Sequence, residues 1–406
     1  MPTGTLVHLP VLAPLPISRP VQARAVGGSR HEAGLSRRLV WTVLSAWTVL
    51  WGLVHAPAGG YSWHYFALGA KLLTSPAAGA GGVHLYASHP DLQIGPLSLL
   101  VAAPLRHLDP WQGRVAASVL LTAMGLFVLG ALVRVREQTD RVPDSLLLLT
   151  GLLLLPVWCE LGTHYAHLDD ALALGFAVLA LSALRSGRPV AAALLLAAAA
   201  DSKPWALAFG VLLLVLPAAQ QRRAAAVFAG AVALAWLPFL VGDPHTLSSL
   251  GQFTIHNSPS SALRALGVTT PATPSWDRPA QLLLGGSVAL LALRRGRWTA
   301  VPLAVVVARL LLDPATYPYY TAGLLLACAA VDLLTPRRQL PLWTAGAAGL
   351  YLLDQIGSAA LPAGTLGAVR AVYCLVVLAM LVLPGQQASV VPAGPPKAVQ
   401  LPVPVR

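Results

Sequence analysis

Residues 115–136 read VAASVLLTAMGLFVLGALVRVR, an apolar block that ends at Arg134 and Arg136. A helix that crosses a bilayer needs about 20 apolar residues, with about 17 as the lower limit. Similar blocks recur along the 406 residues, of which 56% are hydrophobic and 10% are charged. Soluble domains average roughly 45–50% apolar and 25% charged residues. The composition therefore predicts an all-α, polytopic integral membrane protein. It excludes a soluble enzyme, a disordered chain, a disulfide scaffold and a β-barrel, whose strands would alternate.

The two ends of the chain differ from its middle. Residues 1–38 are rich in Pro, Gly and Arg, and residues 385–406 contain the stretch PAGPPK. We predict two disordered cytoplasmic tails, without a cleaved signal peptide, on either side of a transmembrane domain over 39–384. The cysteines are widely separated, so they are predicted to be buried and reduced, without metal-type spacing. They are Cys159, Cys328 and Cys374.

The basic residues orient the chain, because Lys and Arg in short loops mark the cytoplasmic side of a membrane. Arginine-rich turns contain Arg134, Arg136 and Arg141, Arg185 and Arg188, Arg222 and Arg223, Arg294, Arg295 and Arg297, and Arg337 and Arg338. The net charge of +12 is thus a topology signal, and nucleic acid is not predicted as a partner. Most acidic residues fall at the opposite, extracytoplasmic side.

Thirteen apolar blocks lie between the tails, at 39–55, 94–105, 115–133, 145–158, 168–184, 189–200, 204–217, 224–241, 280–293, 298–312, 320–334, 341–357 and 365–384. The N-terminal tail and the 134–141 turn are both cytoplasmic, so an even number of spans must separate them. The block 94–105, IGPLSLLVAAPL, is the shortest of the three between them and carries two prolines. We assign it to a peripheral or re-entrant helix. About twelve plasma-membrane spans remain, with a large first external region at 56–114 and a later external loop at 242–279.

The first external region holds several groups capable of acid–base chemistry. Its aromatic and leucine residues predict an amphipathic helix over 61–75 that lies on the membrane. A cluster of polar residues, His64, His84, His89 and Asp91, lies on or after this stretch. A metal site is only weakly specified, because no tight spacing fixes a ligand geometry.

A second polar cluster lies in THYAHLDDALAL at 163–174 and contains His164, His167, Asp169 and Asp170. On a helix His167 and Asp170 share a face, three residues apart. Two carboxylates at a helix N-terminus also suit the helix dipole, so simple capping is the alternative interpretation.

Three basic residues are candidates for binding phosphate. Lys203 lies in DSKPWA at 201–206, and Arg309 and Arg370 lie inside predicted spans. Arg matches phosphate geometry, whereas a local ion pair for Lys203 and snorkelling to the interface for the two arginines are the alternatives. Arg309 can also pair with Asp313, four residues later, if the helix continues. Tyr317, in DPATYPYY at 313–320, is a further cavity candidate.

The order of these features resembles the GT-C glycosyltransferases, and most closely the actinobacterial polyprenyl-phosphate-mannose-dependent α-mannosyltransferases of glycosyltransferase family 87. The resemblance covers about 39–240. It is carried by one span before a large external loop, the Leu-Tyr of 84–86, the Gly-Pro of 93–97, the turn at 167–170 followed by Arg-Ser-Gly-Arg at 185–188, and the Lys-Pro of 203–204. Such enzymes generally carry an acidic residue early in the first external loop, whereas 56–66 contains none.

The resemblance implies transfer of a sugar, mannose, from a polyprenyl-phosphate donor to an envelope glycolipid or glycan acceptor at the extracytoplasmic face. His64 or Asp91 would serve as base, and Asp169 or Asp170 would orient the acceptor or the base. Lys203, with Arg309 or Arg370, would hold the donor phosphate, and His89, His164, His167 and Tyr317 would complete the cavity. The resemblance implies no cofactor, and it leaves open whether the enzyme needs a divalent cation. The alternatives are a non-catalytic GT-C relative in envelope assembly and a lipid or sugar transporter.

Overall fold

The computed structural model describes residues 36–75, 79–249 and 251–383, and these form helices without any β-strand. The α-helices are α1 (Arg37–His55), α2 (Trp63–Leu73), α3 (Leu85–Ser88), α4 (Pro96–Ala102), α5 (Pro110–Glu137), α6 (Asp144–Cys159), α7 (Leu168–Arg185), α8 (Pro189–Ser202), α9 (Ala218–Gly242), α10 (His245–Ser249), α11 (Ala262–Ala265), α12 (Asp277–Arg294), α13 (Val301–Leu312), α14 (Tyr320–Leu334), α15 (Leu342–Gly357) and α16 (Ala363–Val382). Apart from 36–38, the predicted tails lie outside the described residues. Helix α1 begins at Arg37, inside the stretch assigned to the first tail.

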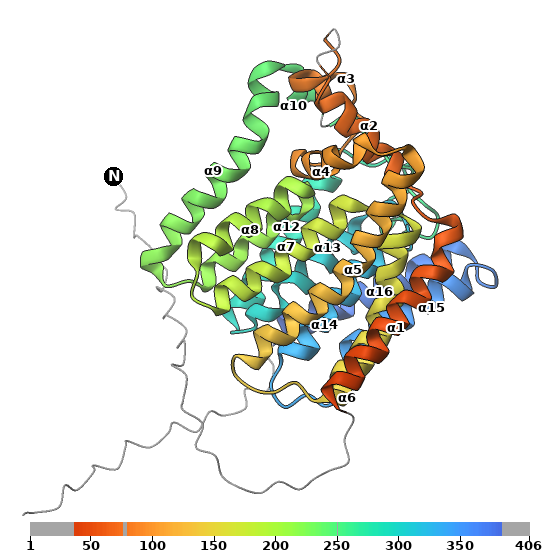
Figure 1. Cartoon of the computed structure of the whole chain (residues 1–406), viewed down its shortest axis with the longest axis vertical. Helices are drawn as coiled ribbons and strands as arrows, with labels where there is room; N and C mark the ends of the chain where they lie inside the picture. Colours follow the sequence, from red (N-terminus) through yellow and green to blue (C-terminus); the bar gives the residue numbers. More distant parts are fainter. Residues whose placement is uncertain (1–35, 76–78, 250, 384–406) are drawn as a thin grey trace, which may run out of the picture.

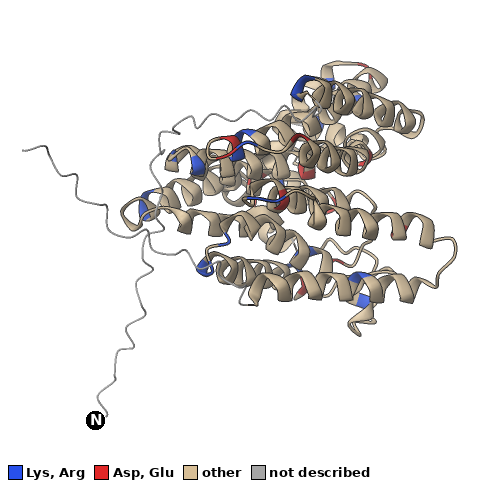
Figure 2. Ribbon diagram, turned by 90° about the horizontal axis from the view of Figure 1, so that it is seen from below, with Lys and Arg blue, Asp and Glu red and all other residues tan. Residues whose placement is uncertain are grey.

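Each of the twelve apolar blocks predicted as spans overlaps a helix within the described residues, and long stretches of ribbon carry no charged residue (Figure 2). Five helical segments among the described residues are long and apolar enough to cross a membrane. They are Arg37–Ala58, Pro110–Glu137, Asp144–His164, Ala218–Gly242 and Ala363–Val382. Four shorter apolar helices add to these: Pro189–Ser202, Pro204–Val215, Trp298–Leu312 and Tyr320–Leu334. The protein is therefore an all-helical membrane protein, and the count of twelve spans stays a prediction.

Two of the short elements have unusual geometry. Pro204–Val215 is a 3₁₀ helix of 12 residues. A 3₁₀ helix rises about 2.0 Å per residue against 1.5 Å for an α-helix, so this segment is longer than an α-helix of the same sequence. The block 94–105 folds as the seven-residue helix α4 and a 3₁₀ turn at Ala103–His107. Each of these two pieces is by itself too short to cross a bilayer, and the assignment of 94–105 to a peripheral or re-entrant helix stays a prediction.

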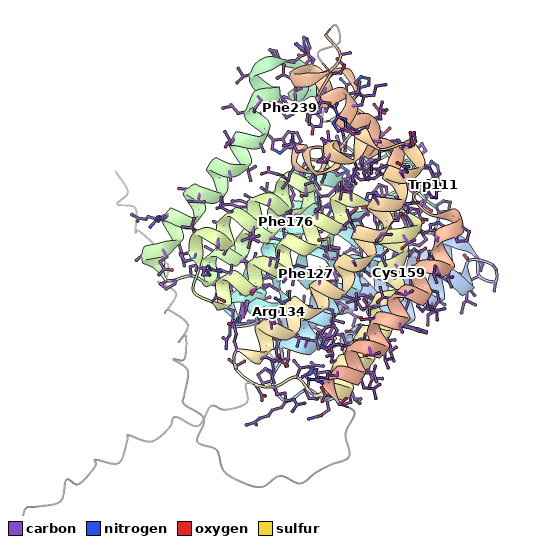
Figure 3. The ribbon with its side chains drawn as sticks, viewed as in Figure 1. Trp111, Phe127, Arg134, Cys159, Phe176 and Phe239 are labelled. Atoms are coloured by element: carbon purple, nitrogen blue, oxygen red, sulfur yellow. The ribbon has the colours of Figure 1, made fainter. Side chains whose placement is uncertain are left out.

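The bundle has two distinct ends. Figure 1 shows α2, α3, α4 and α10 together at one end, and the turn between α5 and α6 at the other. Trp111 and Arg134 lie at opposite ends of α5 (Figure 3). The described residues of 56–114, which are predicted to be the first external region, and the Arg-rich turn after α5 are therefore at opposite ends of the molecule.

The first external region packs against the end of α9. Tyr86 of α3 contacts Trp236 and Phe239 of α9, with ring centroids 5.1 and 4.8 Å apart. His84 Nδ1 lies 2.9 Å from Asp243 Oδ2, and this hydrogen bond lowers the pKa of the Asp243 carboxyl. Helix α9 is thereby joined at this end to the first external region (Figure 1).

Helix α4 is seated directly on the end of α8. The Gly95 amide donates to the carbonyl oxygen of Ser202 at 3.2 Å, and the Ser98 hydroxyl donates to the same oxygen at 3.2 Å. A Cβ atom added at Gly95 would lie 2.0 Å from the carbonyl oxygen of Asp201. Only glycine fits at this joint, because a side chain would meet the backbone of α8.

We expect Gly95→Ala to destabilise the protein by about 1–3 kcal/mol, because overpacking against rigid backbone forces the two helices apart. Thermal unfolding of the detergent-purified protein measures the effect. The control is Gly349→Ala in α15, where an added Cβ meets nothing within 4 Å. Equal melting temperatures for the Gly95→Ala variant and the unaltered protein would contradict the described joint.

Candidate functional site

An irregular turn before α7 positions His167. Residues Glu160–His164 form a π-helical turn, and Ala166 has a φ of 47°, in the left-handed region. A non-glycine residue in this region is uncommon and costs of order 1–3 kcal/mol. Such strain persists only where the surroundings enforce it. Here it reverses the chain so that His167 becomes the N-cap residue of α7.

The first external region is tied to this turn by backbone hydrogen bonds. The amides of Gly60, Tyr61 and Ser62 donate to the carbonyl oxygens of residues 163, 164 and 165 at 2.9, 3.0 and 2.8 Å. This pairing fixes the start of α2. The ring of Phe66 then lies against the His167 imidazole, with centroids 5.8 Å apart. Two segments about 100 residues apart in the chain therefore build one wall of the site.

Asp169 joins a histidine and a lysine. Its Oδ1 lies 2.6 Å from His167 Nδ1, and its Oδ2 accepts a hydrogen bond from Lys203 Nζ. Asp169 is completely buried. Lys203 follows α8, directly before Pro204, so the break between α8 and the 3₁₀ helix directs its ammonium group to α7.

Asp170 forms an ion pair with Arg309, the second cation of the site. Its Oδ1 accepts hydrogen bonds from Arg309 Nη1 at 2.7 Å and from Trp205 Nε1 at 3.1 Å. The Arg309 guanidinium lies over the rings of Trp205 and Tyr320, at 4.6 and 4.3 Å from their centroids. Its Nε lies 3.5 Å from Asp313 Oδ2, which is the predicted contact, although α13 ends at Leu312. A buried charge this well paired and stacked has a fixed position.

Tyrosines from the segment before α14 close the site. Tyr319 stacks on His167 with ring centroids 4.2 Å apart, and Tyr165 packs on Tyr319 at 4.6 Å. Burial raises the pKa of Tyr165 to about 12 and raises the pKa of Tyr319 as well. These phenols therefore stay neutral near pH 7. The ring of Tyr319 covers one face of the imidazole.

The structure brings together five of the predicted site residues: His167, Asp169, Asp170, Lys203 and Arg309. Arg370 lies elsewhere, where its Nη2 pairs with Asp354 Oδ2 at 2.5 Å and its Nη1 donates to the Ser260 carbonyl oxygen at 3.4 Å. Tyr317 contacts the edge of the cluster by stacking on Tyr319, with centroids 5.5 Å apart.

Three residues of the first predicted cluster, and His164 of the second, have other surroundings. His64 is exposed, and its Nδ1 lies 2.9 Å from the Tyr61 carbonyl oxygen. Asp91 is exposed in the segment between α3 and α4, and His89 is half-buried just after α3. His164 packs edge-on against His55, with centroids 5.7 Å apart. Among the described contacts, none of these four residues touches Asp169 or Asp170.

Sequence reasoning missed the aromatic part of the site. Trp205, Tyr319, Tyr320 and Phe66 contact the charged cluster, although none was singled out for such a role. Trp205 lies in the same short motif as Lys203. A tryptophan next to a lysine and a proline at a helix break is a usable signal, because a buried indole N–H needs an acceptor.

Three side chains of the cluster lie close enough together to hold a metal ion. His167, Asp169 and Asp170 offer ligand atoms that all lie within 4.8 Å of one another. The same two carboxylates already pair with Lys203 and Arg309. A divalent cation would fit only by replacing contacts that these basic side chains now make. The expectation that no metal is needed stays a prediction.

A lateral apolar groove has Asp201, two residues before Lys203, in its lining. It has a volume of about 570 Å³ and lies between α4, α8 and α9, and Asp201 is the one charged residue that lines it in the described chain. Leu194 and Leu234 in its wall are 49% and 74% exposed, so the groove opens sideways from the bundle. An apolar chain can lie in such a groove.

The geometry thus combines two cations, a carboxylate-bound imidazole and an apolar groove. This combination can hold an anionic head with a hydrocarbon tail and can move a proton beside it. Residues 95–336 match the model of glycosyltransferase family 87. The comparison with curated proteins returns no match.

Proposed function

Because the chain belongs to glycosyltransferase family 87, we propose that this membrane glycosyltransferase moves mannose from a polyprenyl-phosphate donor to an envelope glycolipid or glycan acceptor. One observation carries the proposal: Lys203 and Arg309, from separate elements, meet Asp169 and Asp170 beside His167. We place this end of the bundle at the outer face of the plasma membrane, with both termini in the cytoplasm.

The two basic side chains are proposed to hold the donor phosphate. In a direct displacement, the acceptor oxygen forms a bond to the anomeric carbon, and the bond from that carbon to the phosphate oxygen breaks. Polyprenyl phosphate leaves with the electron pair. Positive groups placed where negative charge develops stabilise this transition state, and Lys203 and Arg309 supply them. The groove between α4, α8 and α9 would hold the prenyl chain.

We propose His167 as the base that takes the acceptor proton. Two carboxylates near Nδ1, Asp169 at 2.6 Å and Asp170 at 3.2 Å, support this role, because their negative charge stabilises the imidazolium that forms when the ring takes up a proton. Asp169 would then orient the base, which is one of the two roles expected for it. His64 and Asp91 stay as alternatives for the base, and an experiment described below separates them.

The donor is tested with radiolabelled sugar in proteoliposomes. We expect transfer from polyprenyl-phosphate mannose and none from a nucleotide sugar. Shortening the prenyl chain should raise KM at least about tenfold, since each buried CH₂ contributes roughly 0.8 kcal/mol. The KM of each donor is measured at a saturating concentration of acceptor lipid extract.

A substitution in the groove between α4, α8 and α9 tests whether this surface binds the prenyl chain. Ala198→Trp would fill the groove and raise KM for the long donor, whereas Ala225→Trp, on an exposed part of α9, is the matched control. Equal use of short and long donors, with no effect of Ala198→Trp, would remove the groove from the proposal. Transfer from a nucleotide sugar alone would overturn the proposed donor class.

A further inference from the structure

A second, larger cavity lies on the other side of α2. Its volume is about 1000 Å³, and it is lined by residues 57–61, by one face of α2, by residues 105–109 and by the start of α5. Phe66 of α2 contacts His167, whereas His64 and Lys71 of the same helix line this cavity. Helix α2 therefore stands between the catalytic cluster and a separate site.

The cavity collects the basic residues of the first external region. The stretch 56–114 contains three Lys or Arg residues, which are Lys71, Arg106 and Arg114, and all three line the cavity. His64 and His107 line it too, and Asp109 is the one carboxylate that does so in the described chain. Within residues 36–75, 79–249 and 251–383, none of the three cations has a carboxylate partner within 4 Å. The Arg106 side chain donates to the Thr74 hydroxyl.

Such a concentration of cations needs an explanation, because Lys and Arg are depleted from extracytoplasmic segments. Like charges that face one cavity repel each other unless an anion joins them. This reasoning rests on the topology proposed above. Three carboxylates of the proposed outer end, Asp169, Asp170 and Asp243, are paired with other groups and do not neutralise these cations.

The same cavity has an apolar rim. Leu68, Leu108, Trp111 and Tyr61 line it and are 45%, 40%, 63% and 67% exposed. Trp111 projects from the end of α5 at the level of α2 (Figure 3). Exposed Trp and Tyr side chains are typical of the membrane interface, where their rings lie at the depth of the lipid headgroups. Cations beside such a rim suit an anion that carries hydrocarbon.

We propose that this cavity binds the phosphate of an anionic lipid headgroup, with the phosphodiester on Lys71, Arg106 and Arg114 and the acyl chains along the Leu68–Trp111 side. A free phosphate would use the same cations and leave the apolar rim without a function. The site is distinct from the one proposed for the donor and does not depend on the identity of the sugar.

Native mass spectrometry of the detergent-purified full chain tests the site. Phosphatidylglycerol, phosphatidylcholine and inorganic phosphate are titrated onto the protein and onto the triple variant Lys71→Gln, Arg106→Gln, Arg114→Gln. We expect the triple variant to bind phosphatidylglycerol about 100-fold more weakly, as each Lys or Arg near an anionic lipid surface contributes a few-fold or more to affinity. The control variant, Arg222→Gln, Arg223→Gln, Arg295→Gln, removes three exposed basic residues from the predicted cytoplasmic turns and should bind as before.

Three outcomes would overturn the proposal. One is that the control variant loses as much affinity for phosphatidylglycerol as the triple variant, which would show general charge attraction. Another is equal binding of phosphatidylcholine, which would show an apolar site. The third is displacement of the lipid by inorganic phosphate at equal concentration, which would show a free-phosphate site. If the triple variant does not fold, Lys71→Gln alone should still weaken binding about fivefold. A failed donor assay leaves this binding result intact, so the two proposals fail separately.

Discussion

His167→Gln is expected to lower kcat for sugar transfer about 10²–10⁴-fold, which is the usual contribution of a general base. Glutamine keeps a polar side chain of similar reach but cannot take up the acceptor proton. The imidazole is held by the Asp169 carboxylate 2.6 Å from Nδ1 and by the stacked ring of Tyr319. The measurement is kcat for transfer at saturating concentrations of donor and acceptor.

His64→Gln is the matched control. His64 lines the cavity beyond α2 and is exposed, so we expect its replacement to change kcat by about twofold at most, as for most surface substitutions. Asp91→Asn should behave in the same way. If instead His64→Gln or Asp91→Asn abolishes transfer while His167→Gln retains it, the base lies in the first external region.

Asp170→Asn should have the largest effect on stability. Removing one partner of a buried ion pair costs about 3–5 kcal/mol, because the remaining charge is left without compensation. Arg309 is buried, and its shortest contact to a carboxylate is the 2.7 Å bond to Asp170. The second carboxylate, Asp313, lies 3.5 Å from Arg309 Nε and compensates only in part. Thermal and denaturant unfolding in detergent measure the loss.

A double variant distinguishes loss of charge balance from general damage. Asp170→Leu combined with Arg309→Met removes both charges, and such replacements are often neutral or stabilising. The double variant should therefore be more stable than Asp170→Asn while transfer stays absent, and it should not reach the stability of the unaltered protein, because Asp313 loses its cation and Trp205 loses its acceptor. Arg141→Gln breaks a surface pair with Asp144 in which Arg141 is 72% exposed, and it should cost about 0–1 kcal/mol. Equal destabilisation by Arg141→Gln and Asp170→Asn would contradict the role given to burial.

The charged half of the site could be predicted from short motifs. The spacing of His167, Asp169 and Asp170 indicated a shared helix end, and the polar residues of 201–206 and 309–313 were each costly at membrane depth. Which cation meets which carboxylate could not be predicted, because α7, α8 and α13 come together only in the packed bundle. Arg370 carried the same sequence signal as Arg309, and its pairing with Asp354 depends on the packing of α16.

In the irregular parts of the fold, too, some features could be predicted from the sequence and others depend on packing. Two prolines and a short length indicated that 94–105 does not span, and this block forms α4 and a 3₁₀ turn. Nothing in the apolar run of 204–215 distinguishes a 3₁₀ helix from an α-helix, since both fit a uniformly apolar stretch. The left-handed Ala166 was also invisible, because only its surroundings hold an alanine there. Local patterns indicate where helices occur, and packing decides the strained positions.

The pairing of the two cations with carboxylates also shapes the reaction cycle. Lys203 and Arg309 already have carboxylate partners before any donor binds, because they form ion pairs with Asp169 and Asp170. In the proposed reaction the arriving phosphate takes part of the carboxylates' place, so binding is an exchange of counter-ions. The departing polyprenyl phosphate would be exchanged back in the same way. The enzyme would thus keep its cations ordered between turnovers and would not be trapped by its own lipid product.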